Sequence, residues 1–289
     1  MNADELRQAL EQEGARWEVS DDALDAEVRL GYLPSEGVPP LDEQERLAAQ
    51  MVEEEPLGAA APTYPPAFDW RDVNGQNFIT PIRDQAECGS CVSFGTCAAV
   101  EGTLQAELSV PDSGVDLSEA HLFYCVAFAQ GRRCSGPNGG WFPKAAVAAF
   151  QQDGVPDEAC FPYTAGDQEC SECSDWQSRA TKISDWRPLN SPVEMKAWLA
   201  EHGALVASMK VYEDFQHYVG GVYRHVAGGV LGGHCISLVG YDDGEGFWIA
   251  KNSWSASWGE QGFFRIAYGQ CAIDSGALGV EGVQTPNSA

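Results

Sequence analysis

The stretch Gln85-Ala86-Glu87-Cys88-Gly89-Ser90-Cys91-Val92-Ser93-Phe94 decides how this 289-residue chain is interpreted. It begins as a loop of small and polar residues and continues, from Cys91, as a helix-forming segment. The first turn of a helix carries unpaired N–H groups and partial positive charge, which stabilise a thiolate and lower the pKa of a thiol. Cys91 is therefore the candidate nucleophile. We expect its backbone N–H and the side-chain amide of Gln85 to donate to an oxyanion on an attacked carbonyl.

The Cys88-x-x-Cys91 spacing is ambiguous alone, because a redox pair or half of a zinc site has the same spacing. His234 opens an apolar strand, and Asn252 follows 18 residues later. An imidazole can hold the thiolate as an ion pair and protonate a leaving amine, while an amide oxygen fixes the imidazole's orientation. Trp254 is expected to shield that hydrogen bond. The alternative is that His234 is a core histidine and Asn252 a turn residue. That alternative does not explain why Cys91, His234 and Asn252 occur together.

Composition excludes several classes of protein. The length allows one large domain or two small ones, and 44% hydrophobic residues exclude a disordered chain. The net charge of −26 disfavours nucleic acid and acidic membrane surfaces as partners. No transmembrane helix is expected, and residues 1–7 lack the features of a secretory signal. Ten cysteines favour an oxidising compartment, such as the periplasm or the exterior of the cell.

Residues 1–60 differ from the remainder, residues 61–289, in charge and cysteine content. They hold 16 acidic and 4 basic residues and no cysteine. Leu6, Leu10 and Trp17 are expected on one face of a short helix. A second apolar patch comprises Leu24, Val28, Leu30 and Tyr32. Because this segment is too small and too charged to fold alone, we expect it to dock on the remainder, with a solvated acidic tail as the alternative.

The remainder changes from helical to strand patterns. Helices are expected at 91–108, 115–129 and 143–152, the second with Ser118 as its N-cap. Strands are expected at 204–211, 235–241, 246–254 and 262–269. A helical half followed by a β half predicts an α+β fold of two subdomains with a cleft between them. Residues 51–66 are expected to form an exposed linker that proteases can cut.

Seven motifs then identify a resemblance; in order, they are PAFDWRD, QAECGSC, LSEAHLFYC, NGG, GGHCISLVGY, KNSW and SWGEQGFFRI. On these motifs, residues 62–283 resemble the papain-like cysteine proteases. The resemblance implies the papain-like fold and thiol-peptidase activity. It also implies the roles of four residues: Cys91 as nucleophile, His234 as general acid/base, Asn252 as its orienting partner and Gln85 as the oxyanion-hole side chain. The stretch HVAGGVLGGHCISLVGY looks most like the cathepsin B branch, although that branch's occluding loop is absent.

The resemblance also implies how a substrate binds. The family binds substrate largely by backbone pairing, so Gly139 and Gly140 are expected to let an extended peptide lie against their loop without a side-chain clash. Other substrate-binding residues carried over are Trp141, Ser208, Met209, Gly233, Trp254 and Gly276. Since Gly276 stands where an acid would select a basic side chain, we expect a hydrophobic or aromatic residue two positions before the cut (P2).

Cysteine pairing follows from the same resemblance. It implies a Cys88–Cys134 bridge, and Cys125 paired with either Cys170 or Cys173 while Cys160 takes the other. Free, buried thiols are expected at Cys97, Cys235 and Cys271. No histidine and cysteine lie at metal-ligand spacing, so neither a metal nor a cofactor is expected.

Three functions remain open on the sequence. The first is a monomeric cysteine endopeptidase, made as a zymogen, that acts on peptides or proteins and is inhibited in cis by residues 1–60. The second is a related transpeptidase or amide hydrolase, which only its products would distinguish. The third is a catalytically silent binding domain, which the presence of all four catalytic residue types disfavours.

Overall fold

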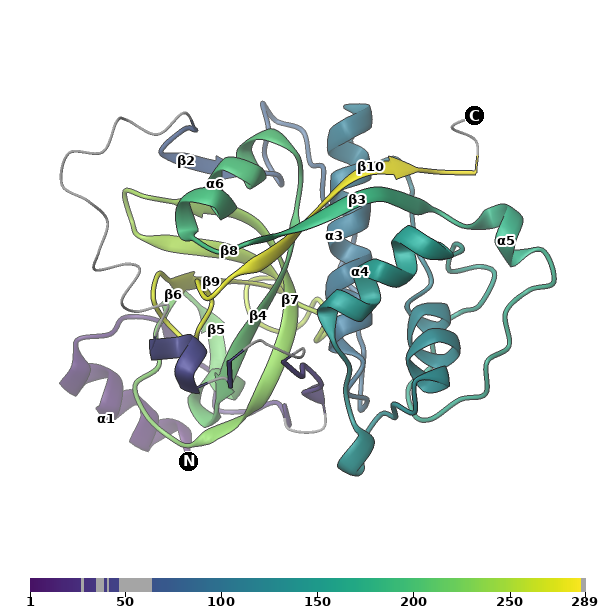
Figure 1. The fold of residues 1–289 in the computed structure, drawn as a ribbon. Coiled ribbons are helices and arrows are strands. Elements are labelled where there is room, and N and C mark those ends of the chain that lie inside the picture. Colours follow the sequence, from purple (N-terminus) through teal and green to yellow (C-terminus); the bar gives the residue numbers. More distant parts are fainter. Residues whose placement is uncertain (27–28, 35–38, 41, 47–63, 287–289) are drawn as a thin grey trace.

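The computed structural model describes residues 1–26, 29–34, 39–40, 42–46 and 64–286. Figure 1 shows a strand-rich half on the left and a helical half on the right. The two halves meet where α3 (Cys91–Leu108) packs against β7 (Val230–Asp242). This arrangement confirms the predicted α+β fold of two subdomains.

Eight strands form one sheet in the strand-rich half. Seven follow one path, in the order β3 (Lys182–Leu189), β10 (Ala277–Gln284), β4 (Leu205–Tyr212), β7, β8 (Phe247–Lys251), β9 (Phe263–Ala267) and β6 (Val222–Tyr223). The eighth, β2 (Ala67–Asp69), pairs with β7. Strands β4, β7, β8 and β9 confirm the four expected strands, although β7 begins earlier and is longer than expected. Met209 on β4 lies opposite His234 on β7, so the predicted base stands on a central strand.

The helical elements confirm two of the three expected helices in full. After α3 come η2 (His121–Ala127), η3 (Gly136–Asn138), α4 (Pro143–Gln152), α5 (Trp176–Arg179), α6 (Pro192–Glu201) and η4 (Glu213–His217). The helix expected at 115–129 begins only at Glu119 and is a π-helix over its central residues. Ser118 caps it as expected, because its Oγ accepts the His121 N–H at 3.0 Å. Helix α3 is buried continuously over residues 91–105, since it is covered from both halves.

Three disulfides stabilise the helical half: Cys88–Cys134, Cys125–Cys170 and Cys160–Cys173. The first confirms the expected bridge, and the others select one of the two pairings left open. Cys97, Cys235 and Cys271 are free and buried, as expected, and Cys91 is also free.

The N-terminal segment docks on the strand-rich half. Its helix α1 (Ala3–Glu13) buries Leu6 and Leu10, but ends at Gly14, whose φ of +65° stops the helix. The expectation that Trp17 shares the face of this helix is therefore wrong. Trp17 instead follows the helix and is buried separately.

Aromatic packing and strand pairing hold this part of the segment. The Trp17 ring contacts Tyr218 and Tyr223, and its Nε1 donates to the Arg224 carbonyl at 3.0 Å. Strand β1 (Glu18–Val19) then pairs with β5 (Tyr218–Gly220). In Figure 1 the segment (purple) accordingly lies along the lower side of the strand-rich half, not out in solvent.

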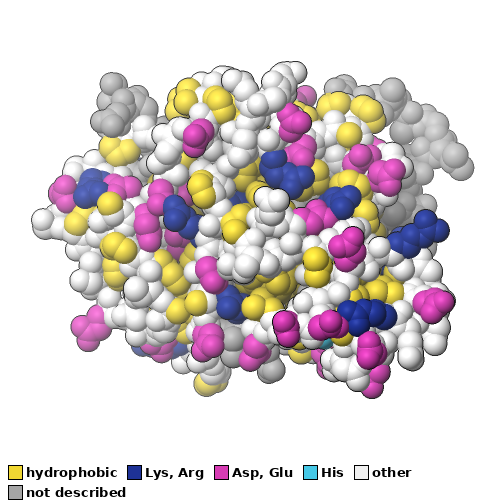
Figure 2. Space-filling view, turned by 180° about the vertical axis from the view of Figure 1, so that it is seen from behind, with side chains coloured by type: hydrophobic (Ala, Val, Ile, Leu, Met, Phe, Trp, Pro, Cys, Tyr) yellow, Lys and Arg dark blue, Asp and Glu magenta, His cyan; other side chains and the backbone are white. Residues whose placement is uncertain are grey.

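The surface agrees with the acidic composition. On the face in Figure 2, acidic side chains are spread among single Lys and Arg side chains, with no continuous basic patch. Within the described part of the chain, no helix is both long and apolar enough to cross a membrane. Val28 of the second apolar patch and residues 51–63 of the expected linker lie outside the described residues.

Candidate active site

His234 and Asn252 form the hydrogen bond expected of a base and its orienting residue. His234 Nε2 lies 2.7 Å from Asn252 Oδ1, and both residues are buried. The Trp254 ring lies 4.7 Å from the imidazole and belongs to an aromatic cluster around Phe215, so it keeps water from this bond. His234 Nδ1 is buried and has no hydrogen-bond partner among the described residues. It is the ring nitrogen left for a reacting group.

Cys91 is the first residue of α3, as predicted, but its thiol is completely covered. Burial raises the pKa of Cys91 to about 12, although backbone N–H groups, including that of Gly31, oppose this rise. Burial likewise lowers the pKa of His234 to about 4, with the bond to Asn252 opposing the change. Both groups are therefore neutral in this closed form. The lowered thiol pKa expected from the helix terminus is not present while the N-terminal segment covers the site.

Gln85 presents its amide to a carbonyl of the N-terminal segment. Its Nε2 donates to the Arg29 carbonyl at 2.7 Å and to the Cys88 carbonyl at 2.8 Å, while its Oε1 accepts from Ser253 Oγ at 2.6 Å. The Ser253 contact fixes which way the amide points. Arg29 is itself held by an ion pair with Asp84 at 2.7 Å. The predicted oxyanion donor therefore already binds a carbonyl oxygen.

Residues 31–33 run through the cleft with strand-like hydrogen bonds. Tyr32 N–H donates to the Gly233 carbonyl at 3.1 Å, Trp141 N–H to the Gly31 carbonyl at 2.7 Å, and Leu33 N–H to the Trp141 carbonyl at 2.9 Å. The backbone that pairs with the bound segment is thus that of Trp141. Gly139 and Gly140 take no part in this pairing through their carbonyls, which accept from Arg132.

Gly140 nevertheless contributes by its lack of a side chain. A Cβ at Gly140 would lie 2.2 Å from the Gly31 carbonyl oxygen, and a Cβ at Gly31 would lie 1.9 Å from the Gly89 carbonyl oxygen. Any side chain at these positions would push the segment out of the cleft. Gly31 and Gly140 therefore permit this close approach, as expected of Gly140.

The Tyr32 side chain lines a pocket beside the cleft, in which about 260 Å³ remains free. Its apolar walls are Pro143, Pro188, Leu189, Val206, Ala277 and Leu278. Ser208 and Gly276, both predicted, also line it, and Gln44 of the N-terminal segment enters beside Tyr32. Met209 does not line the pocket, because strand alternation turns it to the opposite face of β4, into the core. Trp141 and Gly233 meet the segment through their backbones instead.

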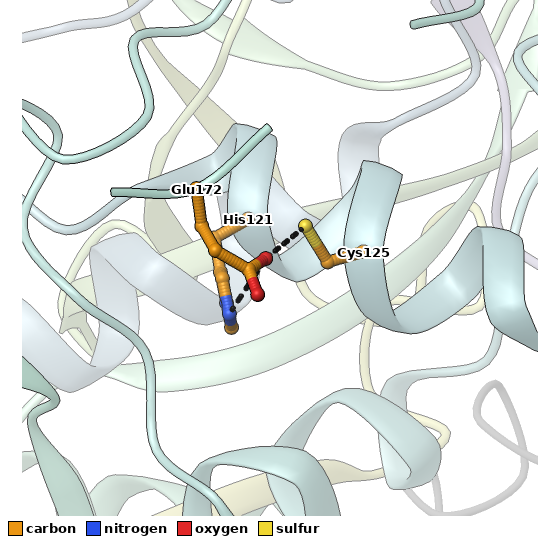
Figure 3. A group of neighbouring side chains, drawn as sticks. All are labelled: His121, Cys125 and Glu172. Carbon is orange, nitrogen blue, oxygen red and sulfur yellow. Dashed lines mark hydrogen bonds and ion pairs between the residues drawn. The ribbon is translucent and has the colours of Figure 1, made fainter. Parts of the chain in front are cut away.

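A second group of potential ligands lies in the helical half. Figure 3 shows His121, Cys125 and Glu172 around one point. Cys125 is bonded to Cys170, and Glu172 Oε2 lies 2.7 Å from both sulfur atoms. The group therefore lacks a thiolate for a metal ion. Burial lowers the pKa of His121 to about 4, so its long contact with Glu172 is not an ion pair at neutral pH.

Comparisons with known proteins agree with this geometry. A family model described as papain family cysteine protease matches residues 64–280. A curated relative, cathepsin B-like CP3 of Giardia intestinalis, is 35% identical over 240 residues, covering 78% of this chain and 77% of the relative. Among solved structures, procathepsin B S9 from Trypanosoma congolense has a TM-score of 0.77 at 23% identity and 99% coverage of both chains. Digestive procathepsin L 3 of Tenebrio molitor has a TM-score of 0.72 at 23% identity, covering 96% of this chain and 87% of that one.

Proposed function

This chain belongs to the papain family of cysteine proteases, and we propose that it is a peptidase zymogen whose residues 1–60 inhibit residues 61–289. The observation that carries the proposal is the occupation of the site: Gln85 holds the Arg29 carbonyl, and Gly31 lies against Cys91. A substrate peptide needs the same space and the same donors. Solved structures similar to this chain along its length include proforms, which supports the same assignment.

Catalysis starts when the segment leaves and solvent reaches the site. Removing the desolvation lowers the pKa of Cys91 and raises that of His234, so a proton passes from sulfur to imidazole. The Cys91 thiolate attacks the scissile carbonyl carbon, and the carbonyl electron pair moves to oxygen. Gln85 Nε2 and the Cys91 N–H stabilise that oxyanion.

Collapse of the oxyanion breaks the peptide C–N bond and leaves a thioester on Cys91. The imidazolium of His234 gives its proton to the departing amine. Neutral His234 then takes a proton from water, whose oxygen attacks the thioester, and Cys91 leaves as the carboxylic product forms. Asn252 accepts from His234 Nε2–H throughout, so that Nδ1 faces the reaction.

A hydrophobic or aromatic side chain at P2 fits the pocket that Tyr32 lines. Six apolar side chains form much of its wall, and the polar residues Lys144, Asn190, Ser208 and Ser275 also line it. The φ of Gly276 is +137°, which disfavours any side chain, so Ser208 is the better position at which to add an acid. Ser208→Asp should raise the ratio of kcat/KM for Arg over Phe at P2, whereas Ser208→Asn should not. An unchanged ratio in Ser208→Asp would contradict the pocket assignment.

The zymogen proposal is tested on the full chain. Wild type and Cys91→Ala are incubated with reductant at pH 4–7, with intact mass and hydrolysis of a peptide carrying Phe at P2 measured together. We expect only wild type to lose its N-terminal segment, by cleavage within 51–66, and to gain activity. Product masses then distinguish hydrolysis from acyl transfer. Full activity in the uncleaved chain would refute inhibition by the segment, and activity in Cys91→Ala would refute the assignment of Cys91 as nucleophile.

The three disulfides fit a protein made for an oxidising compartment.

A further inference from the structure

Lys210 on β4 is a buried cation in the peptidase domain whose counter-ions come from the N-terminal segment. Its Nζ lies 2.7 Å from Asp42 Oδ1 and 2.6 Å from Glu45 Oε2. The Tyr212 hydroxyl donates to the same Glu45 carboxylate at 2.8 Å. The Lys210 side chain is only 3% exposed in this closed form.

Residues 64–286 supply no carboxylate to Lys210 within ion-pair distance. The nearby Asp214 is already engaged, since it accepts from the Tyr223 hydroxyl at 2.6 Å and contacts His225 at 3.1 Å. His225 stacks on Tyr212, which fixes the position of the phenol ring. When the segment leaves, the Lys210 ammonium and the Tyr212 hydroxyl therefore lose their carboxylate partner together. A group with three N–H donors and no acceptor is then open to solvent.

This cation borders the pocket that Tyr32 lines. Ser208 lines that pocket and stands two residues before Lys210 on β4, so both side chains lie on one face of the strand, about 7 Å apart at their Cα atoms. Gln44, the neighbour of Glu45, enters the same pocket. One short helical turn, residues 42–46, thus lines the pocket through Gln44 and pairs with the cation through Asp42 and Glu45.

We propose that Lys210 and Tyr212 form a carboxylate-binding subsite of the activated enzyme, which selects substrates with an Asp or Glu side chain close to the hydrophobic P2 residue. The inference rests on the proposed peptidase function and adds a second substrate feature to it. The subsite is occupied by Asp42 and Glu45 in the zymogen and by the substrate's acidic side chain afterwards. The activated enzyme remains acidic, because residues 1–60 carry a net charge of only −12 out of the −26 of the full chain. Its overall charge disfavours acidic peptides, so a local preference for them is readily recognised.

The test uses enzyme activated from the full chain and peptides with blocked ends. All peptides carry Phe at P2, and Glu is placed in turn at each of the neighbouring positions on both sides, each with a matched Gln peptide. The readout is the ratio of kcat/KM for Glu over Gln, in which each enzyme serves as its own reference. Wild type and Lys210→Met are compared, with Lys182→Met as a control because Lys182 loses the same charge but contacts the Gln152 carbonyl, away from the segment.

At one position we expect the Glu/Gln ratio to fall about tenfold from wild type to Lys210→Met, since charge-assisted hydrogen bonds are among the stronger ones. Tyr212→Phe should lower it about threefold, and Lys182→Met should leave it unchanged. Equal ratios in wild type and Lys210→Met at every position would overturn the subsite. A fall of the same size in Lys182→Met would also overturn it, because it would show a general charge effect.

Failure of the proposed function would be visible separately, since no Gln peptide would be cut. The subsite is then judged by binding, with the segment removed by an added protease that cuts a site placed within 51–63. A synthetic peptide of residues 29–46 should bind wild type more tightly than its Asp42→Asn, Glu45→Gln version. That difference should shrink about tenfold in Lys210→Met; an undiminished difference would contradict the assignment.

Discussion

Tyr32 provides the most quantitative test of how the N-terminal segment binds. Its side chain is 7% exposed and lies against the apolar wall of the pocket that substrates are proposed to use. Truncating a fully buried aromatic side chain to Ala costs about 3–5 kcal/mol. The pocket retains free volume beside Tyr32 and is open at one side, so we expect about 2–3 kcal/mol here. That energy corresponds to roughly 30- to 150-fold weaker binding.

The assay measures inhibition of the activated enzyme by a synthetic peptide of residues 1–46. Tyr32→Ala should raise the inhibition constant by the amount above. Tyr32→Phe should change it much less than Tyr32→Ala, because it keeps the ring and removes only the hydroxyl's hydrogen bonds to Gln44, a long one of 3.3 Å, and to Ser208. Glu13→Ala, at an exposed position of α1, is the matched control. An inhibition constant for Tyr32→Ala within about threefold of wild type would refute the claim that contact with the pocket wall anchors the segment.

Three further predictions concern pH, the catalytic histidine and the disulfides. The hydrogen bond from Lys210 lowers the pKa of Asp42 below 3.8. The contribution of Asp42 to segment binding is therefore complete above about pH 4 and is lost as the pH falls through the lowered pKa. Below pH 4, the inhibition constant should rise less steeply for Asp42→Asn than for wild type. Asn252→Ala should lower kcat at least tenfold, which steady-state kinetics on the activated enzyme can measure; unchanged kcat would exclude an orienting role. Replacing Cys160 and Cys173 by Ser should lower the free energy of unfolding by about 3 kcal/mol in urea titrations, whereas equal stability would mean that this bridge constrains little.

The sequence predicted those elements whose residues repeat regularly or are buried throughout. Helices α3 and α4 and strands β4, β7, β8 and β9 are of this kind. Strand β3 was not predicted from the sequence, because it is an edge strand with few buried residues and Pro188 near its end. Its residues therefore show no clear alternation of apolar and polar side chains. Helix α6 was also not predicted, although its sequence indicates where a helix begins. Ser191 caps it by accepting the Glu194 N–H, and Pro192 follows at the first helical position.

The candidate site was predictable where it depends on residue type and chain order. Four residues could be identified because each supplies a group that thiol-protease chemistry requires: Gln85, Cys91, His234 and Asn252. The position of Met209 required knowing which face of β4 borders the pocket, and the pairing through Trp141 required knowing the register. The environment of Lys210 depends on Asp42 and Glu45, far away in the chain, and no local pattern links them.

The central claim, that the segment covers a latent nucleophile, is tested most directly by alkylating Cys91. The full chain and the activated enzyme are exposed to iodoacetamide at pH 6, and modification of each free cysteine is followed by peptide mass spectrometry. Cys97, Cys235 and Cys271 are buried and serve as internal references. The account predicts that Cys91 reacts at least a hundredfold faster after activation, because its thiol is buried and neutral beforehand. Equal rates before and after activation would contradict it.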